Sequence, residues 1–207
     1  MKTVIFDSTI TIDSPIGPIT LKSLGNAVVK VELHGLEGPG AGRRSGHGSG
    51  HGSGHGSGHT AQNAANPTAD PSAPSSVLIE AAQQLSEFFA GERTTLDFAV
   101  EPAGTEFQRT VWSEIGKVGF GEVISYADIA RRIGNPNAVR AVGGAVGSNP
   151  VPLVIGCHRI LGAASNITGY SGGDGLPTKR WLLAHENISY RDVPANRRDA
   201  ETPLKIE

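Results

Sequence analysis

The feature that most constrains the fold is residues 36–75, which carry almost no apolar periodicity. A four-residue Gly-His-Gly-Ser repeat runs through them and spaces the histidines equally, at His47, His51, His55 and His59. Sequence rich in glycine and serine behaves as a flexible linker and joins no core, although neutral imidazoles on a pliable chain could also gather around zinc or nickel. We therefore expect an N-terminal domain over residues 1–100 that contains this linker, a second domain over 101–190, and a disordered tail over 191–207.

Composition excludes several kinds of protein. The 207 residues suit one large or two small domains, and their hydrophobic content of 38% is diluted by the linker. A net charge of −2 gives no global signal for nucleic acid, so any DNA contact must come from a local patch. The single cysteine excludes an internal disulfide and a zinc site of clustered cysteines, and it suits a reducing cytosol. We expect no signal peptide, membrane span or metal site, which predicts a cytoplasmic or nucleoid-associated protein.

The N-terminal domain is predicted to combine strands with one helix. Short apolar segments over residues 4–34, separated by turn chemistry at 14–18, predict a small antiparallel sheet. Residues 76–89 carry apolar side chains at helical spacing, and Gly91 would end that helix. Alternating apolar residues over 96–100 predict one further strand at the edge of this domain.

The C-terminal domain is predicted to be mainly helical. Thr105 and Gln108 form a capping box at the start of a helix. The apolar face of that helix is expected to consist of Phe107, Val111, Trp112 and Ile115. Ser125 caps a second helix, and a turn at residues 134–136 leads to a third from about Asn137. Two short helices joined by a glycine-containing turn make a helix-turn-helix, although many such pairs are plain helical hairpins.

Local features favour DNA binding by this helix pair. Arg131, Arg132 and Arg140 concentrate positive charge where phosphate contacts would need it. The second helix of the pair is rich in alanine and glycine, and each glycine inside a helix costs roughly 1 kcal/mol relative to alanine. A cluster of such residues suggests that a partner must come close. Asn149 and Pro150 end this unit and lead straight into the segment that carries the cysteine.

The only cysteine, Cys157, follows a short apolar run over residues 151–155 and precedes His158. The run predicts a buried strand that stops at Gly156 and delivers the thiol at its end. A thiolate nucleophile needs a base and shelter, which an imidazole at a strand end could supply. A lone cysteine is more often a buried small hydrophobe, and neighbouring side chains on a strand point to opposite faces, so adjacency does not prove contact.

Seven short motifs occur in one order along the chain: Phe107-Gln108-x-x-Val111-Trp112, Gly121 to Tyr126, Arg140 to Gly144, Asn149 to Pro152, Cys157-His158-Arg159, Gly169 to Gly173 and Trp181 to Glu186. Together they resemble the methylated-DNA–protein-cysteine methyltransferases, the O6-alkylguanine-DNA alkyltransferase family. The match covers about residues 105–187, and residues 4–100 are compatible with the family fold. The resemblance implies an α+β fold, with a ribonuclease-H-like α/β N-terminal lobe that has a small antiparallel sheet, and a mainly helical C-terminal lobe with a helix-turn-helix.

The resemblance also implies a mechanism. Cys157 would attack the alkyl carbon of O6-alkylguanine, and His158 would take the thiol proton through a water tethered by Asn149. Glu186 would orient the imidazole, and Tyr170 would hydrogen-bond or protonate guanine N3, which follows the nucleophile–base–orienter logic of a triad. The thioether product is stable, so each molecule acts once. The family uses no organic cofactor, and we expect none here.

For DNA, the resemblance implies a monomer that binds the minor groove of a duplex and rotates the damaged nucleotide into a pocket. Arg140 resembles the family's arginine finger, which fills the gap left in the base stack, and Tyr126 resembles the residue that crowds the adjacent phosphate. Further DNA contacts are expected at Ala138, Gly143 and Arg159. The residues expected to form the substrate pocket are Gly156, Ile160, Ser171 and Tyr126.

Two departures from the family pattern leave the substrate range open. Gly156 stands where the family has proline, which predicts a looser pocket that admits bulkier adducts or reacts more slowly. The loop over residues 173–178 is also longer than usual. Three alternatives to simple repair follow: a lesion sensor that binds without transfer, an engineered self-labelling tag, and a transferase for a specialised adduct.

Overall fold

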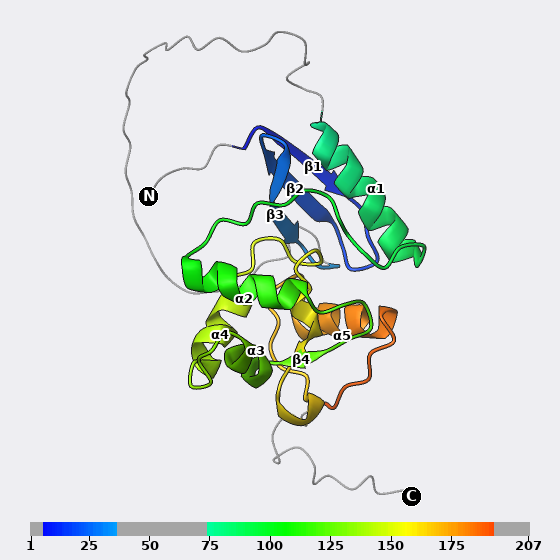
Figure 1. Ribbon diagram of the computed structural model, residues 1–207. Coiled ribbons are helices and arrows are strands. Elements are labelled where there is room, and N and C mark those ends of the chain that lie inside the picture. Colours follow the sequence, from blue (N-terminus) through cyan, green and yellow to red (C-terminus); the bar gives the residue numbers. More distant parts are fainter. Residues whose placement is uncertain (1–5, 37–73, 193–207) are drawn as a thin grey trace, which may run out of the picture.

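The computed structural model describes residues 6–36 and 74–192 (Figure 1). Residues 37–73 of the predicted linker, with its four histidines, and residues 193–207 of the predicted tail lie outside the described residues. The start of the tail is ordered, contrary to expectation. Arg191 donates its backbone N–H to Ser165 (2.9 Å), and Asp192 forms an ion pair with Arg180 (2.7 Å).

The N-terminal part contains a three-stranded antiparallel sheet in the order β1 (Ser8–Ile12), β2 (Ile19–Leu24) and β3 (Ala27–Leu33). The alternation that predicted these strands buries every second side chain of β2. Gly17 adopts a φ of +93° in the turn between β1 and β2, and a Cβ there would overlap the carbonyl of Gly35. The turn therefore requires glycine.

Helix α1 (Ser76–Ala90) covers one face of this sheet (Figure 1). It ends as predicted, because Gly91 takes the left-handed conformation that accommodates a C-terminal cap. The strand predicted over residues 96–100 does not form. Only an isolated bridge joins Val100 to Val28, since the segment makes just two backbone hydrogen bonds to Val28.

The C-terminal part holds helices α2 (Glu106–Gly116), α3 (Tyr126–Arg132), α4 (Val139–Gly147) and α5 (Leu176–His185). The capping box predicted at Thr105 is present, and Ser125 caps α3 as predicted, in a second capping box with Asp128. Within α2, Val111, Trp112 and Ile115 are buried, but Phe107 is exposed, which corrects its place on the apolar face. The indole N–H of Trp112 donates to the carbonyl of Ala145 (2.8 Å) and so fixes α2 against α4.

The segment before the cysteine is a series of turns, which corrects the predicted strand over residues 151–155. Asn149 accepts from the backbone N–H of Val151 (3.1 Å) and donates to the carbonyl of Ile155 (2.8 Å), so its side chain bridges the turns. Leu153 has a positive φ of 76°, which no strand allows. Cys157 consequently opens a short 3-10 helix, η1 (Cys157–Arg159), rather than ending a strand.

Two further short elements follow η1. Strand β5 (Ile160–Leu161) pairs in parallel with β4 (Ile124–Ser125), and the 3-10 helix η2 is Ala163–Ser165. The parallel pair holds the end of η1 beside the start of α3. Cys157 is therefore anchored on both sides, by the Asn149 turns before it and by β5 after it.

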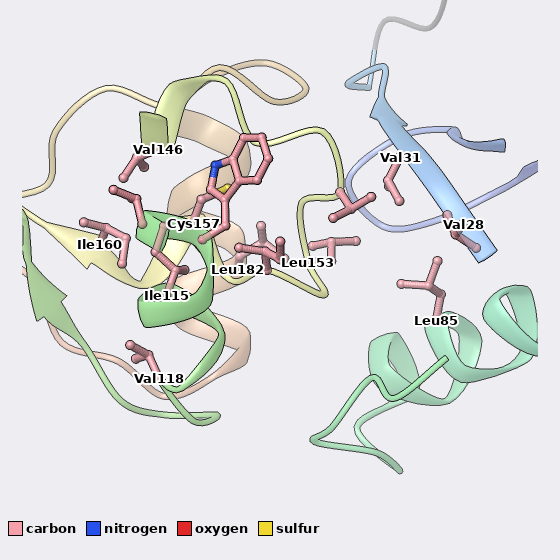
Figure 2. Packing of buried hydrophobic residues seen from close by; sticks show 14 of the residues in the cluster. Val28, Val31, Leu85, Ile115, Val118, Val146, Leu153, Cys157, Ile160 and Leu182 are labelled. Carbon is pink, nitrogen blue, oxygen red and sulfur yellow. The ribbon is translucent and has the colours of Figure 1, made fainter. Parts of the chain in front are cut away.

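Buried apolar side chains from both parts form one contiguous cluster. Figure 2 shows Val28 and Val31 of β3 facing Leu85 of α1, with Leu153 between this group and the residues around Cys157. The predicted boundary near residue 100 thus does not divide the hydrophobic core. No helix among residues 6–36 and 74–192 is long and apolar enough to cross a membrane.

Candidate active site

Cys157 lies at the floor of a cavity of about 230 Å³. The thiol-bearing residue is only 6% exposed, whereas other parts of the lining reach solvent. The cavity is lined by Lys30, Val31, Glu32, Leu33, Asn149, Pro152, Cys157, Tyr170, Ser171 and Gly172. The cavity is therefore formed by strand β3 together with the C-terminal segments that were predicted to act on a substrate. Sequence reasoning did not connect β3 with the site.

The pKa of the Cys157 thiol is raised by burial. The Asn149 amide and the Tyr170 hydroxyl favour the thiolate and oppose that rise, as does the positive charge of Lys179. A thiol with a raised pKa is protonated at neutral pH, so reaction requires a base that removes its proton.

His158, the next residue, is fully buried and can serve as such a base in its neutral form. Its Nε2 lies 2.7 Å from Oε1 of Glu186. Burial lowers the pKa of the imidazole, and the charges of Arg159 and Lys179 act in the same direction against the opposing effect of Glu186. The imidazole is therefore neutral at pH 7. Since an ionised carboxylate only accepts hydrogen bonds, the proton of the neutral imidazole is on Nε2, which donates a hydrogen bond to Glu186.

This tautomer leaves Nδ1 of His158 unprotonated. Nδ1 is buried and has no hydrogen-bond partner within the part of the chain that the structure describes. A buried acceptor without a partner costs free energy unless a water or a substrate group satisfies it. The arrangement can thus accept a proton at Nδ1 while Glu186 holds the ring in place.

Glu186, the residue that caps α5, is held from several sides. Arg159 forms a bidentate pair with it, with Nε 2.8 Å from Oε2 and an η-nitrogen 3.0 Å from Oε1, and the backbone N–H of Gly121 donates to Oε2 (3.2 Å). Burial would raise the pKa of Glu186, but hydrogen bonds from His158 and Arg159 outweigh it and lower this pKa to about 2. Glu186 is therefore ionised throughout the neutral range.

Arg159 does not lie where the DNA-contact prediction placed it. It is only 8% exposed, and its guanidinium is bonded to Glu186 and to the carbonyl of Val118 (2.7 Å). A buried guanidinium with these partners has no access to a phosphate. Its effect on the site is to neutralise Glu186, which keeps the neighbouring imidazole uncharged.

Tyr170, Asn149 and Ser171 surround the cavity as predicted. The Tyr170 hydroxyl is buried without a hydrogen-bond partner in the described ranges, and burial together with the nearby thiolate raises the pKa of Tyr170 well above its usual value. This phenol remains protonated and can donate. Ser171 donates its hydroxyl to the carbonyl of Gly147 (3.1 Å), which links the cavity wall to the end of α4.

Gly156 and Ile160 do not line the cavity, contrary to the predicted pocket. A Cβ on Gly156 would lie 3.0 Å from Cδ and from an η-nitrogen of Arg159, so this position faces the arginine. Ile160 is fully buried in the core, and its carbonyl accepts a hydrogen bond from Lys179 (2.6 Å). The structure thus corrects the idea that Gly156 widens the pocket directly.

Lys179 was missed by sequence reasoning. It is fully buried in α5 and donates to the carbonyls of Ile160 and Thr168 (3.2 Å). Burial lowers its pKa to about 8. The sequence signal for its burial was its spacing from Leu182 and Leu183, because residues three and four positions apart share one helix face.

A second cavity, of about 570 Å³, lies beside α3 and α4. It brings together Tyr126, Arg140 and Gly143 from the predicted DNA-binding set. Tyr126 therefore belongs to this surface rather than to the cavity of Cys157. Ala138, the N-cap of α4, is half-buried and does not line it. Arg140 is exposed, and a Cβ on Gly143 would meet no atom within 4 Å.

The fold and the site define a protein with one buried cysteine on a cavity, followed directly by a neutral histidine that is hydrogen-bonded to a charge-compensated glutamate. Comparison with known proteins gives the family. Residues 106–188 match the family model described as 6-O-methylguanine DNA methyltransferase, DNA binding domain. The chain belongs to the methylated-DNA–protein-cysteine methyltransferase family.

Curated relatives and solved structures support this assignment. The constitutive methylated-DNA–protein-cysteine methyltransferase of Bacillus subtilis (strain 168) is 47% identical over 115 residues, which cover 56% of this chain and 69% of the relative. The protein of the same name from Mycobacterium tuberculosis (strain ATCC 25618 / H37Rv) is 38% identical over 186 residues, covering 85% and 90%. The crystal structure of Mycobacterium tuberculosis OGT in complex with DNA aligns with a TM-score of 0.63 at 35% identity, over 86% of this chain and 91% of that one.

Proposed function

We propose that this protein repairs DNA by transferring the alkyl group from O6 of guanine to Cys157, once per molecule. The observation that carries the proposal is a buried thiol that lines a cavity and is followed directly by a neutral histidine. The Nε2 of this histidine is hydrogen-bonded to Glu186, and its Nδ1 is buried without a hydrogen-bond partner among the described residues. Membership of the methyltransferase family gives this chemistry its substrate.

In the proposed step the Cys157 sulfur forms a bond to the alkyl carbon while the bond from that carbon to O6 breaks. The thiol proton passes through a water to Nδ1 of His158, and Glu186 stabilises the imidazolium that results. Asn149 has one amide hydrogen and one lone pair beyond its two backbone bonds, which suit it to hold that water. The protonated Tyr170 hydroxyl donates to guanine N3, so that the base leaves without a full negative charge.

The target base must leave the duplex to reach the cavity, since O6 is buried in the base stack. We assign α3 and α4 as a helix-turn-helix that enters the minor groove, with Arg140 filling the vacated position and Tyr126 crowding the adjacent phosphate. The open space over Gly143 supports close approach of α4 to DNA. We assign the N-terminal part to a ribonuclease-H-like lobe and expect a monomer that works in a cytoplasmic or nucleoid-associated setting.

Intact mass tests the transfer. The protein is incubated with duplex DNA that contains one O6-methylguanine, and its mass is expected to rise by one methyl group in place of one hydrogen. The gain is lost in Cys157→Ala. Tight lesion binding by the wild type without any mass gain would refute transfer and support a lesion sensor. Transfer from free O6-benzylguanine but not from duplex DNA would point to a self-labelling protein.

A second experiment separates the DNA surface from the chemistry. Arg140→Ala should slow transfer from duplex DNA but leave transfer from the free base O6-benzylguanine unchanged, because only the duplex has a stack to fill. Arg109→Ala, which removes an exposed arginine of α2 outside the second cavity and outside the helix pair, is the matched control. Equal slowing of both reactions by Arg140→Ala contradicts the assignment.

A further inference from the structure

Strand β3 forms one wall of the Cys157 cavity and is hydrogen-bonded to both segments that carry its polar groups. The backbone N–H of Val31 donates to the carbonyl of Pro150 (2.8 Å), next to Asn149. The N–H of Gly173 donates to the carbonyl of Leu33 (3.1 Å), in the loop that follows Tyr170. The position of β3 relative to the thiol is therefore fixed by backbone bonds, and the β3 residues that line the cavity are part of the site.

Among the residues that line this cavity, Lys30 and Glu32 are the ones with charged side chains. Glu32 is bonded through one oxygen to Lys30 (2.8 Å) and through the other to Lys22 (2.8 Å). Two ammonium groups thus share one carboxylate, which leaves an excess positive charge. Lys30 uses one of its three N–H donors in this pair, and its side chain is 45% exposed.

Of these lining residues, Lys30 has a side chain that is half-exposed, on the solvent side or rim of the cavity, whereas Cys157 is buried. An adduct bonded to the sulfur through its first carbon has its far end directed toward solvent, and hence toward the rim. A negative group at the far end of the adduct would lie near the Lys30 ammonium, which has N–H groups that are not used in its pair with Glu32. Both carboxylate oxygens of Glu32 already accept from lysines. Charged partners at a pocket mouth select among ligands even when they contribute little affinity.

Resting on the proposed function, we propose that Lys30 is a specificity-determining residue that favours O6 adducts ending in a carboxylate, such as O6-carboxymethylguanine. The transfer step is unchanged: the bond from sulfur to the adduct's CH₂ forms, the bond from CH₂ to O6 breaks, and the thiol proton goes to His158. Lys30 contacts the carboxylate and not the reacting carbon. A half-exposed ion pair predicts roughly a two- to fivefold preference in rate constant.

The test compares second-order transfer rate constants on three duplexes of one sequence. They carry O6-carboxymethylguanine, O6-carbamoylmethylguanine, which is its neutral isostere, or O6-methylguanine. The wild type should react faster with the carboxymethyl than with the carbamoylmethyl adduct, and the ratio should fall with added salt. Lys30→Gln should bring the ratio close to one, and Lys30→Arg should retain the preference. Lys117→Gln, which removes the same charge from an exposed position outside the cavity, should leave the ratio unchanged.

Two results would overturn the inference. One is a wild-type ratio at or below one. The other is equal slowing of all three duplexes by Lys30→Gln, which would make Lys30 a DNA-backbone contact. The methyl duplex separates this inference from the proposed function: methyl transfer without a charge preference rejects only the role of Lys30, whereas no transfer to Cys157 from any duplex rejects the function itself.

Discussion

Glu186→Gln is expected to destabilise the protein strongly at neutral pH. The pKa of Glu186 falls from 4.5 to about 2, which corresponds to about 3 kcal/mol in favour of the ionised carboxylate in the folded state. The substitution leaves the buried guanidinium of Arg159 without its counter-charge, and breaking a buried pair in this way costs about 3–5 kcal/mol. Urea denaturation at pH 7 should show a loss of this size in the free energy of unfolding.

The loss should also depend on pH. A carboxyl whose pKa is lowered by folding stabilises the protein above its ordinary pKa, and this stabilisation disappears as the pH falls from 4.5 towards 2. The difference between wild type and Glu186→Gln should therefore shrink at pH 3. Glu87→Gln is the matched control, because Glu87 pairs with Arg93 at 2.7 Å on the surface and should lose far less. Equal losses for the two variants at pH 7, or a loss that does not change with pH, would refute the reasoning.

Three further predictions concern the other buried groups of the site. NMR titration of His158 should give a pKa below its ordinary 6.5, because burial opposes the charged imidazole, and a value above 6.5 would contradict a neutral base. Gly156→Pro should change stability by no more than about 1 kcal/mol in urea denaturation, because a φ of −67° suits proline. The same variant should alter the rate constant for O6-benzylguanine without altering its apparent binding constant, since the added atoms press on Arg159 and not on the cavity; an unchanged rate constant would reject this. Lys179→Met should cost about 1–3 kcal/mol at pH 7, because two backbone carbonyls lose their donor. Between about pH 8 and 10.5, Lys179 of the wild type is deprotonated in the folded state but protonated in the unfolded state. The free energy of unfolding of the wild type should therefore rise with pH across that window, and this contribution should be absent from Lys179→Met. The same pH dependence in the variant and the wild type would argue against the lowered pKa.

Local signals in the sequence predicted the elements that depend on neighbouring residues. Helix α1 and its glycine cap follow from spacing and from one residue that tolerates positive φ. The capping box at Thr105 likewise involves groups only three positions apart. The family motifs also pointed to His158 and Glu186, which the structure joins by a hydrogen bond, and to Cys157, Asn149 and Tyr170, which line one cavity.

The errors lie where individual side-chain contacts, near or far along the chain, decide the outcome. An apolar run before Cys157 predicted a strand, but the Asn149 side chain bonds to its backbone and folds it into turns. Arg159 was predicted to contact DNA, but it is buried against Glu186, which comes 27 positions later in the chain. Gly156 was assigned to the pocket, although its α-carbon faces Arg159. The pattern of apolar and charged residues does not encode these contacts.

The hydrogen bonds from β3 to the Pro150 and Gly173 segments make the acceptor site a composite of two halves of the chain. A fragment limited to residues 101–190 would keep the nucleophile and its base but lack one wall, and its Tyr170 loop would lose an anchor. Substrate range can consequently evolve, or be engineered, through substitutions in the N-terminal sheet that leave the reacting residues untouched. Libraries confined to the segment around the cysteine would sample only part of the surface that an adduct meets.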